Sequence, residues 1–341
     1  MFGNGFRLNL IFTRPAVETR HSNLPKSNVV KKESFHYLWS NSHKPVLSIK
    51  PGDQVHFEVN EVYSWQMTEK TKAEDFSKLD NSKLYPLAGP VYVEGAKPGD
   101  ALVVRVESVK PAKWGWSAIM PPMGLLEEFT DPYLYIWNLR GAQKYARFVK
   151  QIRVPLNPFC GVMGVAPAEP GFHQVMPPGK HGGNLDIRHL TDGSTLLIPV
   201  WNDGALFSTG DVHAGQGDGE VCVTAIECAG DVTFTFDLKK NANLQAPIYY
   251  SKPLNLSRTG YFATTGIAPD LMTASKEAVR GMISFLGENL GLSMEGAYIL
   301  CSVIGELRIH EIVDAPNWVV GMMIPRDLIK EGRTPRRRGR N

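Results

Sequence analysis

Residues 181–227 read HGGNLDIRHLTDGSTLLIPVWNDGALFSTGDVHAGQGDGEVCVTAIE, and this stretch decides how the rest of the chain is interpreted. Its glycines separate short apolar runs, a pattern typical of β-strands joined by tight turns. Between the runs lie more acidic and amide side chains than a core strand or a plain surface loop requires. The stretch therefore predicts a β-rich protein that carries polar chemistry in its turns.

Length, composition and charge limit the class of protein. The chain has 341 residues, of which 43% are hydrophobic, so one large or two ordinary domains with a sizeable core are expected. The formal net charge is +3, and the tail RTPRRRGR at residues 333–340 supplies several of the positive charges. Since the rest of the chain is close to neutral, we expect no nucleic-acid partner. The tail is interpreted as a solvated end, although such a sequence could also bind phosphate polymers or anionic membranes.

Cysteine usage and hydropathy favour a soluble protein of the cytoplasm. The cysteines form no CxxC pair and are too few for a disulfide framework in a chain of this length. They are expected to be small buried hydrophobic residues in a reducing compartment. No secretory signal is recognisable and no apolar run approaches the length of a membrane span, so we expect no membrane partner. The four residues concerned are Cys160, Cys222, Cys228 and Cys301.

The first half of the chain predicts strands and long loops. Alternating apolar residues flank a Pro-Gly-Asp turn at residues 47–59 and again at 91–106, which predicts two hairpins. The tetrad KPGD occurs in both turns, at 50–53 and 97–100, and hints at a duplication. Two similar turns that arose independently explain the repeat as well, and we favour that explanation. Residues 111–180, rich in proline, glycine and tryptophan, are expected to form long packed loops.

The second half predicts further strands and a pair of helices. Strands are expected at 195–201, 220–227 and 232–238, and then at 306–314 and 317–324. A three- and four-residue apolar period predicts a helix over 269–290 that Gly291 ends, and Ser293 is expected to cap a second helix over 294–303. The fold class is therefore mainly β, with a β-sandwich or barrel-like core and a small α/β addition near the C-terminus. The expected organisation is an arm (1–30), a β-rich domain (31–325) with internal boundaries left open near residues 110 and 245, and a basic tail (326–341).

Asp211 and His213 form the first candidate functional pair. They are two residues apart, so on an extended strand both side chains point to the same side. A carboxylate and an imidazole that converge could bind a zinc-type ion, or the aspartate could orient a histidine base. By itself, the spacing fits slightly better an aspartate in a turn beside a surface histidine.

Further candidates surround this pair. Gln216, Asp218 and Glu220 alternate with glycines, which allow a backbone to approach a ligand closely, although Asp-Gly before a strand is also a common turn. Asn184 and Asp186 repeat the two-residue spacing after a pair of glycines.

Glu227 ends the predicted strand over 220–228. Val221, Val223 and Ala225 share its face, so burial would raise the pKa of its carboxyl and suit it to general acid or base catalysis. A solvated glutamate at the strand end is an equally good interpretation.

Several stretches of the chain resemble the acetamidase/formamidase family. GGNLDIRHL (182–190), GALFSTGDVHAGQGDGEV (204–221) and TAIE (224–227) form the most specific part. The resemblance extends over most of 36–325, and more weakly to His36 and Trp39 in HYLW and to PVLSIKPGDQVHFE (45–58). It also includes GPVYVEGAKPGD (89–100), WGWSAIMPPMGLL (114–126), VPLNPFCGVMGVAPAEPG (154–171) and PPGKHGGN (177–184).

The resemblance implies a metal-dependent hydrolase that converts short aliphatic amides to a carboxylic acid and ammonia. It also implies a mainly β fold and a homo-oligomer. The expected cofactor is a divalent metal ion, zinc in the first place and calcium or another divalent ion as alternatives. The matching polar positions are Glu94, Asn184, Asp186, Asp211, His213, Gln216, Asp218, Glu220 and Glu227, with His36 matching less securely.

Roles are assigned among these positions as a hypothesis. Asp186, Asp211 and His213 are the expected metal ligands, and Glu220 or Glu94 is the expected base. The amides among the matching positions would bind the substrate amide or the developing oxyanion, and the remaining acids complete the catalytic set. These are Asn184 and Gln216, and Asp218 and Glu227, respectively.

One departure from the family pattern leaves the substrate open. After the first hairpin the family tends to have an aspartate and a Gly-Gly-Gln group, whereas this chain has Glu61 and then Ser64, Trp65 and Gln66. Large side chains here could reshape the pocket. The alternative function is a non-catalytic β-domain that keeps the family fold and binds a metal or a small ligand, and release of ammonia from a small amide distinguishes the two.

Overall fold

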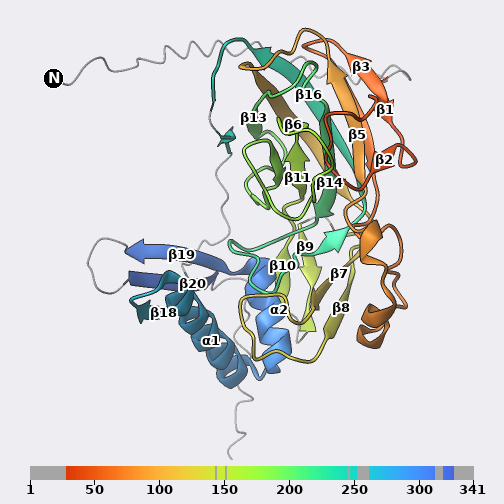
Figure 1. Cartoon of the computed structure of the whole chain (residues 1–341). Helices are drawn as coiled ribbons and strands as arrows, with labels where there is room; N and C mark the ends of the chain where they lie inside the picture. Colours follow the sequence, from red (N-terminus) through yellow and green to blue (C-terminus); the bar gives the residue numbers. More distant parts are fainter. Residues whose placement is uncertain are drawn as a thin grey trace, which may run out of the picture.

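The computed structural model describes residues 28–142, 144–149, 152–244, 246–251, 261–311 and 318–325. The predicted basic tail and all but the last three residues of the predicted arm lie outside these stretches. The described chain consists mainly of strands with a small helical part near its C-terminal end (Figure 1), which confirms the predicted fold class.

Two large sheets form most of the protein (Figure 1). One has six strands, in the order β1 (Val29–Val30), β4 (Gln54–Val59), β16 (Gly230–Lys239), β6 (Ala101–Pro111), β13 (Thr195–Pro199) and β17 (Ile248–Tyr250). The other has nine strands. Six follow the order β12 (Gly182–Asn184), β11 (Phe159–Gly164), β14 (Phe207–His213), β15 (Glu227–Cys228), β7 (Trp114–Ile119) and β8 (Tyr133–Asn138). Attached to β14 is β5 (Leu87–Val93), which also pairs with β2 (Phe35–His36) and β3 (Leu47–Ile49).

Fully buried phenylalanines join the two sheets. Phe57 of β4 and Phe234 and Phe236 of β16 come from the six-stranded sheet, and Phe207 of β14 comes from the nine-stranded sheet. The ring of Phe207 lies 5.0 Å from that of Phe236 and 5.8 Å from that of Phe234, in edge-on geometry. Burial of each ring contributes about 1.5–3 kcal/mol, so this cluster fixes β14 against the opposite sheet.

The two KPGD turns are corners between the sheets, and the prediction of hairpins there is wrong. The first leads from β3 in the nine-stranded sheet to β4 in the six-stranded sheet, and the second leads from β5 to β6 in the same way. In each turn the aspartate carboxylate accepts a hydrogen bond from the lysine N–H at 2.9 Å, in Asp53 to Lys50 and in Asp100 to Lys97. Because β3 and β5 pair in parallel, the repeated tetrad marks two equivalent corners side by side.

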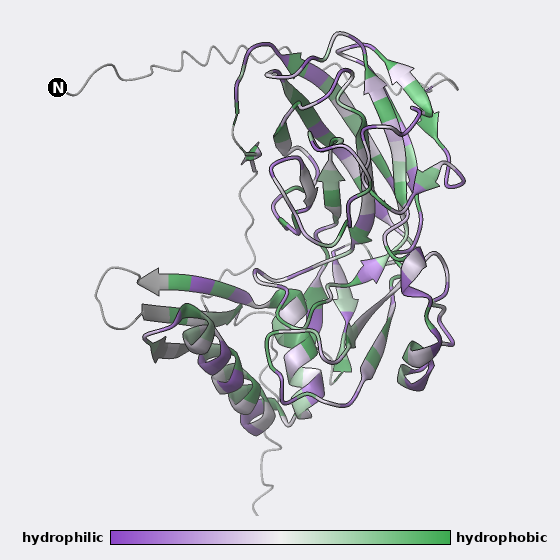
Figure 2. Ribbon diagram, in the orientation of Figure 1, coloured by the Kyte–Doolittle hydropathy of each residue, from purple (hydrophilic) through white to green (hydrophobic). Residues whose placement is uncertain are grey.

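The C-terminal part forms the predicted α/β addition. A three-stranded sheet of β18 (Tyr261–Ala268), β20 (Trp318–Pro325) and β19 (Glu306–Glu311) packs on α1 (Leu271–Leu290), and α2 (Met294–Ile304) follows. Asp270 and Ser293 cap the helices, and Gly291 ends α1 with a φ of 59°. The two helix predictions are confirmed. Hydrophobic and hydrophilic residues alternate along α1 (Figure 2), whereas all residues of α2 from Gly296 to Ile304 are buried.

Two segments differ from the sequence-based expectation. Residues 111–180, expected as loops, contain β7, β8 and β11 as well as the short pair β9 (Tyr145–Arg147) and β10 (Arg153–Pro155). In β7 and β11, which contain glycine or tryptophan, apolar and polar residues do not alternate, because both faces of these strands are largely buried. The strand expected over 220–227 is instead a turn and coil that ends in β15. Cys222 bonds to Ser302 of α2, and Thr224 bonds to Ala118 of β7.

The cysteines and the helices can be placed as well. Cys160, Cys222, Cys228 and Cys301 are free and buried, as expected. Among the described residues, none of the helices has both the length and the apolar character that crossing a membrane requires. Two short 3-10 helices, η1 (Ala73–Lys78) and η2 (Asn81–Lys83), lie in the long connection between β4 and β5.

Candidate active site

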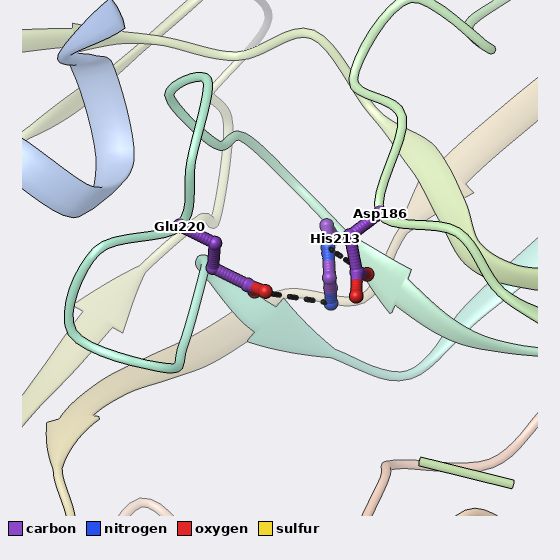
Figure 3. Close-up of side chains that lie close together, drawn as sticks. All are labelled: Asp186, His213 and Glu220. Atoms are coloured by element: carbon purple, nitrogen blue, oxygen red, sulfur yellow. Dashed lines mark ion pairs between the residues drawn. The ribbon is translucent and has the colours of Figure 1, made fainter. Parts of the chain in front are cut away.

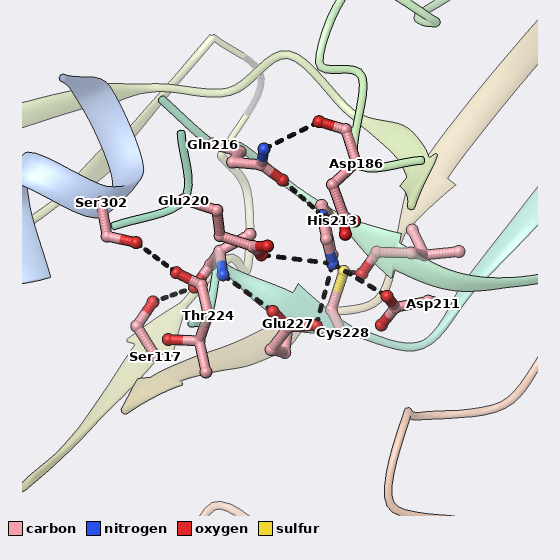
Figure 4. Close-up of polar contacts among 12 residues, drawn as sticks. Ser117, Asp186, Asp211, His213, Gln216, Glu220, Thr224, Glu227, Cys228 and Ser302 are labelled. Atoms are coloured by element: carbon pink, nitrogen blue, oxygen red, sulfur yellow. Dashed lines mark hydrogen bonds and ion pairs between the residues drawn. The ribbon is translucent and has the colours of Figure 1, made fainter. Parts of the chain in front are cut away.

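His213 is the last residue of β14 and lies at the centre of a cluster of carboxylates (Figures 3 and 4). Its Nε2 atom is 3.1 Å from Oε2 of Glu227, 3.3 Å from Oδ2 of Asp211 and 4.0 Å from Oε1 of Glu220. Its Nδ1 atom is 3.9 Å from Oδ1 of Asp186. Four acids from different parts of the chain thus converge on one imidazole that is only 1% exposed.

The backbone around the cluster is strained at three of the acids. Asp186, Asp211 and Glu220 adopt φ values of 48°, 57° and 40°, in the left-handed region that residues other than glycine rarely occupy. Each such residue costs on the order of 1–3 kcal/mol and persists only where the surroundings impose it. The strain aims the carboxylates toward one point, which is the pattern expected of a functional site.

Gln216 determines that Nδ1 of His213 carries a proton. The Gln216 side chain donates from Nε2 to the backbone oxygen of Asp186 at 3.0 Å, so its Oε1 is the atom that faces His213 Nδ1 at 2.9 Å. Because Oε1 can only accept, Nδ1 carries the proton and donates it. Nε2 then points at two carboxylates, an arrangement that calls for positive charge there, either as a second proton on the ring or as a metal ion bound to the neutral ring.

Burial and mutual repulsion perturb the acids of the cluster. Burial is the main cause that raises the pKa of Asp186 to about 6 and that of Glu227 to about 7, and it raises the pKa of Glu220 well above its usual value. Burial lowers the pKa of His213, but the attraction of Glu227 and Asp211 outweighs it, so that pKa lies well above the usual value. The cluster therefore binds positive charge strongly, as protons or as a metal ion.

The donor set fits a divalent metal ion. Two groups of three, Asp186 with His213 and Glu220, and Asp211 with His213 and Glu227, each offer ligand atoms within 4.8 Å of one another. Oδ1 of Asp186 and Oδ1 of Asp211 are buried and have no hydrogen-bond partner among the described residues, although buried carboxylate oxygens are normally paired. Nitrogen and oxygen donors in this number suit zinc and other divalent ions.

Gly161 of β11 lies directly against the side chains of the cluster. A Cβ atom placed on this residue would lie 2.5 Å from Oδ1 of Asp186, 2.8 Å from Oδ2 of Asp211 and 2.9 Å from Cε1 of His213. The backbone N–H groups of Leu185 and Asp186 also donate to the Gly161 carbonyl. Glycine here therefore lets the Asp186 loop settle directly on β11.

The α/β addition holds the loop that carries Glu220. Gly217 packs directly on Gly305 at the end of α2 and donates its N–H to the backbone oxygen of Ser302. The hydroxyl of Tyr298 donates to the backbone oxygen of Val221. Helix α2 is therefore required for the position of Glu220, although it contributes no ligand.

The acids form one wall of a narrow cavity of about 40 Å³, which we call the inner cavity. Asp186, Asp211, Glu220 and Glu227 line that wall. The opposite walls are mainly apolar and aromatic, and they are formed by Val62, Tyr63, Leu84, Tyr85, Trp116, Met120, Met123, Met176, Val223 and Thr224. A space of this size admits little more than an amide group, since one water takes about 30 Å³ of liquid volume.

Tyr63 and Tyr85 are site residues that the sequence analysis missed. Among the described residues, no partner bonds to either hydroxyl, whereas the indole N–H of Trp116 donates to Glu61 and the hydroxyl of Thr224 donates to Ala118. Burial raises the pKa of Tyr63 to about 12 and that of Tyr85 well above its usual value, so both phenols stay protonated and can donate to a ligand. Tyr85 carries no local sequence signal, and Tyr63 could have been found only from its position inside the departure from the family pattern.

Two of the predicted catalytic acids do not line the inner cavity. Glu94 is exposed beyond the end of β5 that pairs with Phe207, whereas His213 ends β14 at the opposite end, so its assignment as a base is wrong. Asp218 pairs instead with Arg188, its Oδ1 lying 3.1 Å from Nε. The structure thus places Asp218 in a buried ionic group, because Arg188 also donates to Glu306 at 2.8 Å.

The two predicted amides are also placed differently from their assigned role. Gln216 is buried beside His213 and orients that ring, as described above, and it does not line the inner cavity. Asn184 lies on β12, paired with Val162, with a buried Oδ1 that no described residue bonds, and it does not line the inner cavity either. His36, the weaker match, donates from Nδ1 to the Leu38 carbonyl and bonds through Nε2 to the Ser208 hydroxyl, away from the acids.

The departure at Ser64 and Trp65 changes the loop more than the cavity. Both residues have positive φ, at 56° and 65°, where the family pattern has glycine. Their side chains bond away from the site, Ser64 to the Lys83 carbonyl at 2.8 Å and Trp65 to Oδ1 of Asn60 at 2.8 Å. Buried Glu61 ties the loop down, since its carboxylate accepts from the Trp65 N–H at 3.1 Å and from the Trp116 indole at 3.0 Å.

Cys160 has no features of a nucleophile. It is buried on β11, and burial raises the pKa of its thiol to about 12, so the thiolate is not populated near neutral pH. The site chemistry therefore rests on the acids and the histidine.

Comparisons with known proteins identify relatives of this chain. Among curated proteins, the formamidase of Methylophilus methylotrophus is 26% identical over 366 residues, which cover 87% of this chain and 89% of that protein. The acetamidase of Mycolicibacterium smegmatis is 28% identical over 268 residues, covering 60% of this chain and 66% of that protein.

Solved structures give the same result. A γ-lactamase from Delftia acidovorans superposes with a TM-score of 0.81 at 25% identity, covering 91% of this chain and 92% of the other. An acetamidase from Bacillus halodurans has a TM-score of 0.62 at 31% identity, with 87% and 96% covered. The model of the acetamidase/formamidase family matches residues 22–175 and 171–331. The chain therefore belongs to the acetamidase/formamidase family of amide hydrolases.

Proposed function

We propose that this chain is a metal-dependent amidase that hydrolyses small amides, such as formamide or acetamide, to a carboxylic acid and ammonia. The observation that carries the metal dependence is the environment of His213. Gln216 fixes a proton on Nδ1, and Nε2 faces Oδ2 of Asp211 and Oε2 of Glu227 at 3.3 and 3.1 Å. The two carboxylates require positive charge at Nε2, which a second ring proton or a metal ion can supply. The buried Oδ1 atoms of Asp186 and Asp211, which no described residue bonds, favour the metal ion.

Asp186, Asp211 and His213 are the proposed ligands, as the sequence predicted, and we add Glu227. Its Oε1 is held by the Ala225 N–H at 2.8 Å, its side chain is 6% exposed, and Oε2 faces the imidazole. A carboxylate held this firmly suits a ligand better than a mobile base. A divalent ion bound by these groups would polarise the amide carbonyl or lower the pKa of a water molecule. Zinc is the first choice for this set of donors.

Glu220 is the proposed general base and acid. It lines the inner cavity, its side chain is 17% exposed, and its carboxyl lies 4.0 Å from His213 Nε2. Since burial raises its pKa, the group can take a proton from the attacking water and return it to the leaving nitrogen. That nitrogen then departs as ammonia, which removes the need to expel an amide anion.

Tyr63 and Tyr85 are proposed to bind the carbonyl oxygen of the substrate. They are neutral donors that line the inner cavity together with the acids, and no described residue bonds to their hydroxyls. Donation to the carbonyl would strengthen as negative charge develops on that oxygen, which lowers the barrier to attack. The acids are thus left to handle the metal and the protons.

The test distinguishes residues that bind the metal from the residue that acts as general base. Purified protein is assayed for bound metal by elemental analysis, for ammonia release from formamide and acetamide, and for formation of 4-aminobutanoate from 2-pyrrolidinone, before and after chelation. We expect Glu220→Gln to keep its metal and lose turnover by 100-fold or more, within the usual range for a general base. His213→Ala should lose both metal and turnover.

Other outcomes point to other conclusions. Turnover that survives complete removal of metal would refute the metal dependence. A protein that binds metal but releases no ammonia from any small amide would favour the non-catalytic β-domain. The homo-oligomer and the cytoplasmic location stay predictions, which gel filtration and cell fractionation test.

A further inference from the structure

A second, larger chamber adjoins the inner cavity. Its volume is about 710 Å³, against about 40 Å³ for the inner cavity. The two spaces share five wall residues, Tyr63, Leu84, Tyr85, Met123 and Met176. We call this space the outer chamber, and its size lies in the range of small-molecule sites.

The outer chamber is uncharged and mostly apolar. Four loops form it, namely those between β2 and β3, between β4 and β5, between β7 and β8, and between β11 and β12. None of its lining residues carries a formal charge, and the polar ones are Asn81, Ser82 and Gln174. Met176 at its wall is 43% exposed, so an apolar surface that leads to the acids is left open to solvent. Such a surface is stabilised when an apolar group covers it.

The arrangement also indicates which end of an amide would enter the outer chamber. Tyr63 and Tyr85, the proposed carbonyl donors, border both spaces, whereas Glu220, the proposed proton donor to the leaving nitrogen, borders the inner cavity and not the outer chamber. The carbonyl carbon therefore lies on the side of the chamber, and the nitrogen lies on the side of Glu220.

Resting on the proposed function, we infer that the preferred substrates are primary amides whose acyl chain is an apolar group of several carbons. The amide group occupies the inner cavity and the acyl chain occupies the outer chamber. Formamide and acetamide, which have no chain to place there, are then poor substrates. The reaction releases ammonia and a medium-chain carboxylic acid.

The experiment measures kcat/KM for acetamide, butanamide and hexanamide by ammonia release. Each buried methylene contributes about 0.8 kcal/mol, which corresponds to about a fourfold gain per carbon until the chamber is filled. N-butylacetamide carries its apolar chain on the nitrogen and releases butylamine instead of ammonia, so its hydrolysis is followed by acetate release. It should gain nothing over acetamide. A flat series, or a gain for the N-substituted amide instead, would overturn the inference while leaving the amidase in place.

Variants that fill the outer chamber sharpen the test. Gln174→Trp and Asn81→Trp introduce bulk from exposed positions whose side chains make no hydrogen bond among the described residues. We expect the ratio of hexanamide to acetamide activity to fall at least tenfold in both, and to stay high in Gln174→Ala. Lys70→Trp, on an exposed turn outside the chamber, is the control for an added tryptophan and should leave that ratio unchanged.

A binding readout keeps the inference testable without turnover. The affinities of acetate, butanoate and hexanoate, measured by calorimetry, should rise with chain length in the wild type and not in Gln174→Trp. If no amide is hydrolysed but this trend holds, the proposed function fails and the apolar chamber stands. If the affinities do not change with length, and Gln174→Trp alters only the oligomeric state, the chamber is an interface between subunits and the inference is wrong.

Discussion

Gly161→Ala is the sharpest test of how the site is built. The substitution adds one methyl group on β11, directly beneath the acids. The new Cβ would lie 2.5 Å from Oδ1 of Asp186 and 2.8 Å from Oδ2 of Asp211, whereas real Cβ atoms essentially never approach another atom within 3.0 Å. The first oxygen must therefore retreat by at least 0.5 Å, from 2.5 to 3.0 Å, and the second by at least 0.2 Å.

The expected loss follows from these displacements. A misplacement of about 1 Å at a catalytic centre costs on the order of 100-fold in rate, so a shift of half that size predicts a loss of about 10-fold or more in kcat/KM. The metal should also bind more weakly, because two of its proposed ligands move. The fold should survive with a cost of about 1–3 kcal/mol for overpacking, since Gly161 has no positive φ.

The assay compares kcat/KM, metal content and thermal unfolding of Gly161→Ala with those of Gly287→Ala. The control glycine lies in α1, where an added Cβ meets only the Leu292 carbonyl oxygen at 3.6 Å, an ordinary contact. We expect Gly287→Ala to keep its activity and to gain about 0.5–1 kcal/mol in stability. If Gly161→Ala binds metal and turns over like the wild type, the acids do not meet over β11 as described, and the reasoning fails.

Three further predictions concern the groups around the acids. Gln216→Leu removes the acceptor from His213 Nδ1 and should weaken metal binding by about 10–100-fold in a metal titration, while Gln216→Glu keeps an acceptor and should lose less. Burial raises the pKa of Glu61 to about 7 in the folded protein, above its usual 4.5. The folded state therefore holds this proton more tightly than the unfolded state, and the resulting contribution to the free energy of unfolding is fully present below pH 4.5 and is lost as the pH rises through 7. Urea unfolding at pH 5 and pH 8 should show a loss that is larger in the wild type than in Glu61→Gln, by on the order of 3 kcal/mol, since the raised carboxyls around His213 titrate in both proteins. Arg188→Met should destabilise the fold by about 1.5–3 kcal/mol, because buried Glu306 loses its charged hydrogen bond to Arg188 while it keeps its ion pair with Arg308. Asp218→Asn should keep most of the amidase activity; an inactive but folded Asp218→Asn would return this residue to the catalytic set.

Local patterns in the sequence were sufficient where a residue depends on its neighbours along the chain. The helices were predictable because Asp270, Ser293 and Gly291 cap or end them with short-range bonds and backbone geometry. The two-residue spacing of Asp211 and His213 was not sufficient, because Asp211 has a φ of 57° and departs from the extended backbone that the argument assumed. The prediction of a strand over 220–227 was wrong because the Cys222 N–H bonds to Ser302 of α2 and the Thr224 hydroxyl bonds to Ala118 of β7, which no local pattern reveals.

The resemblance to known amidases identified a set of candidate acids, but it could not show which of them lie at the active site. It placed Glu94 and Asp218 beside Glu220 and Glu227, because all are acids within matching motifs. Only the folded chain separates them, since β5 carries Glu94 to the far end of β14 and Arg188 takes up Asp218.

The sequence by itself thus determined the β-rich class, the helical addition and the family, because these follow from short-range periodicity and from long matching motifs. Only the tertiary structure shows that Gly161 lies directly against the acids and that Gln216 fixes a proton on Nδ1 of His213. It alone also shows that the two tyrosines line the inner cavity. These features depend on contacts between strands and loops far apart in the chain. Their distances are set when the two sheets and α2 pack, and no pattern confined to one segment encodes them.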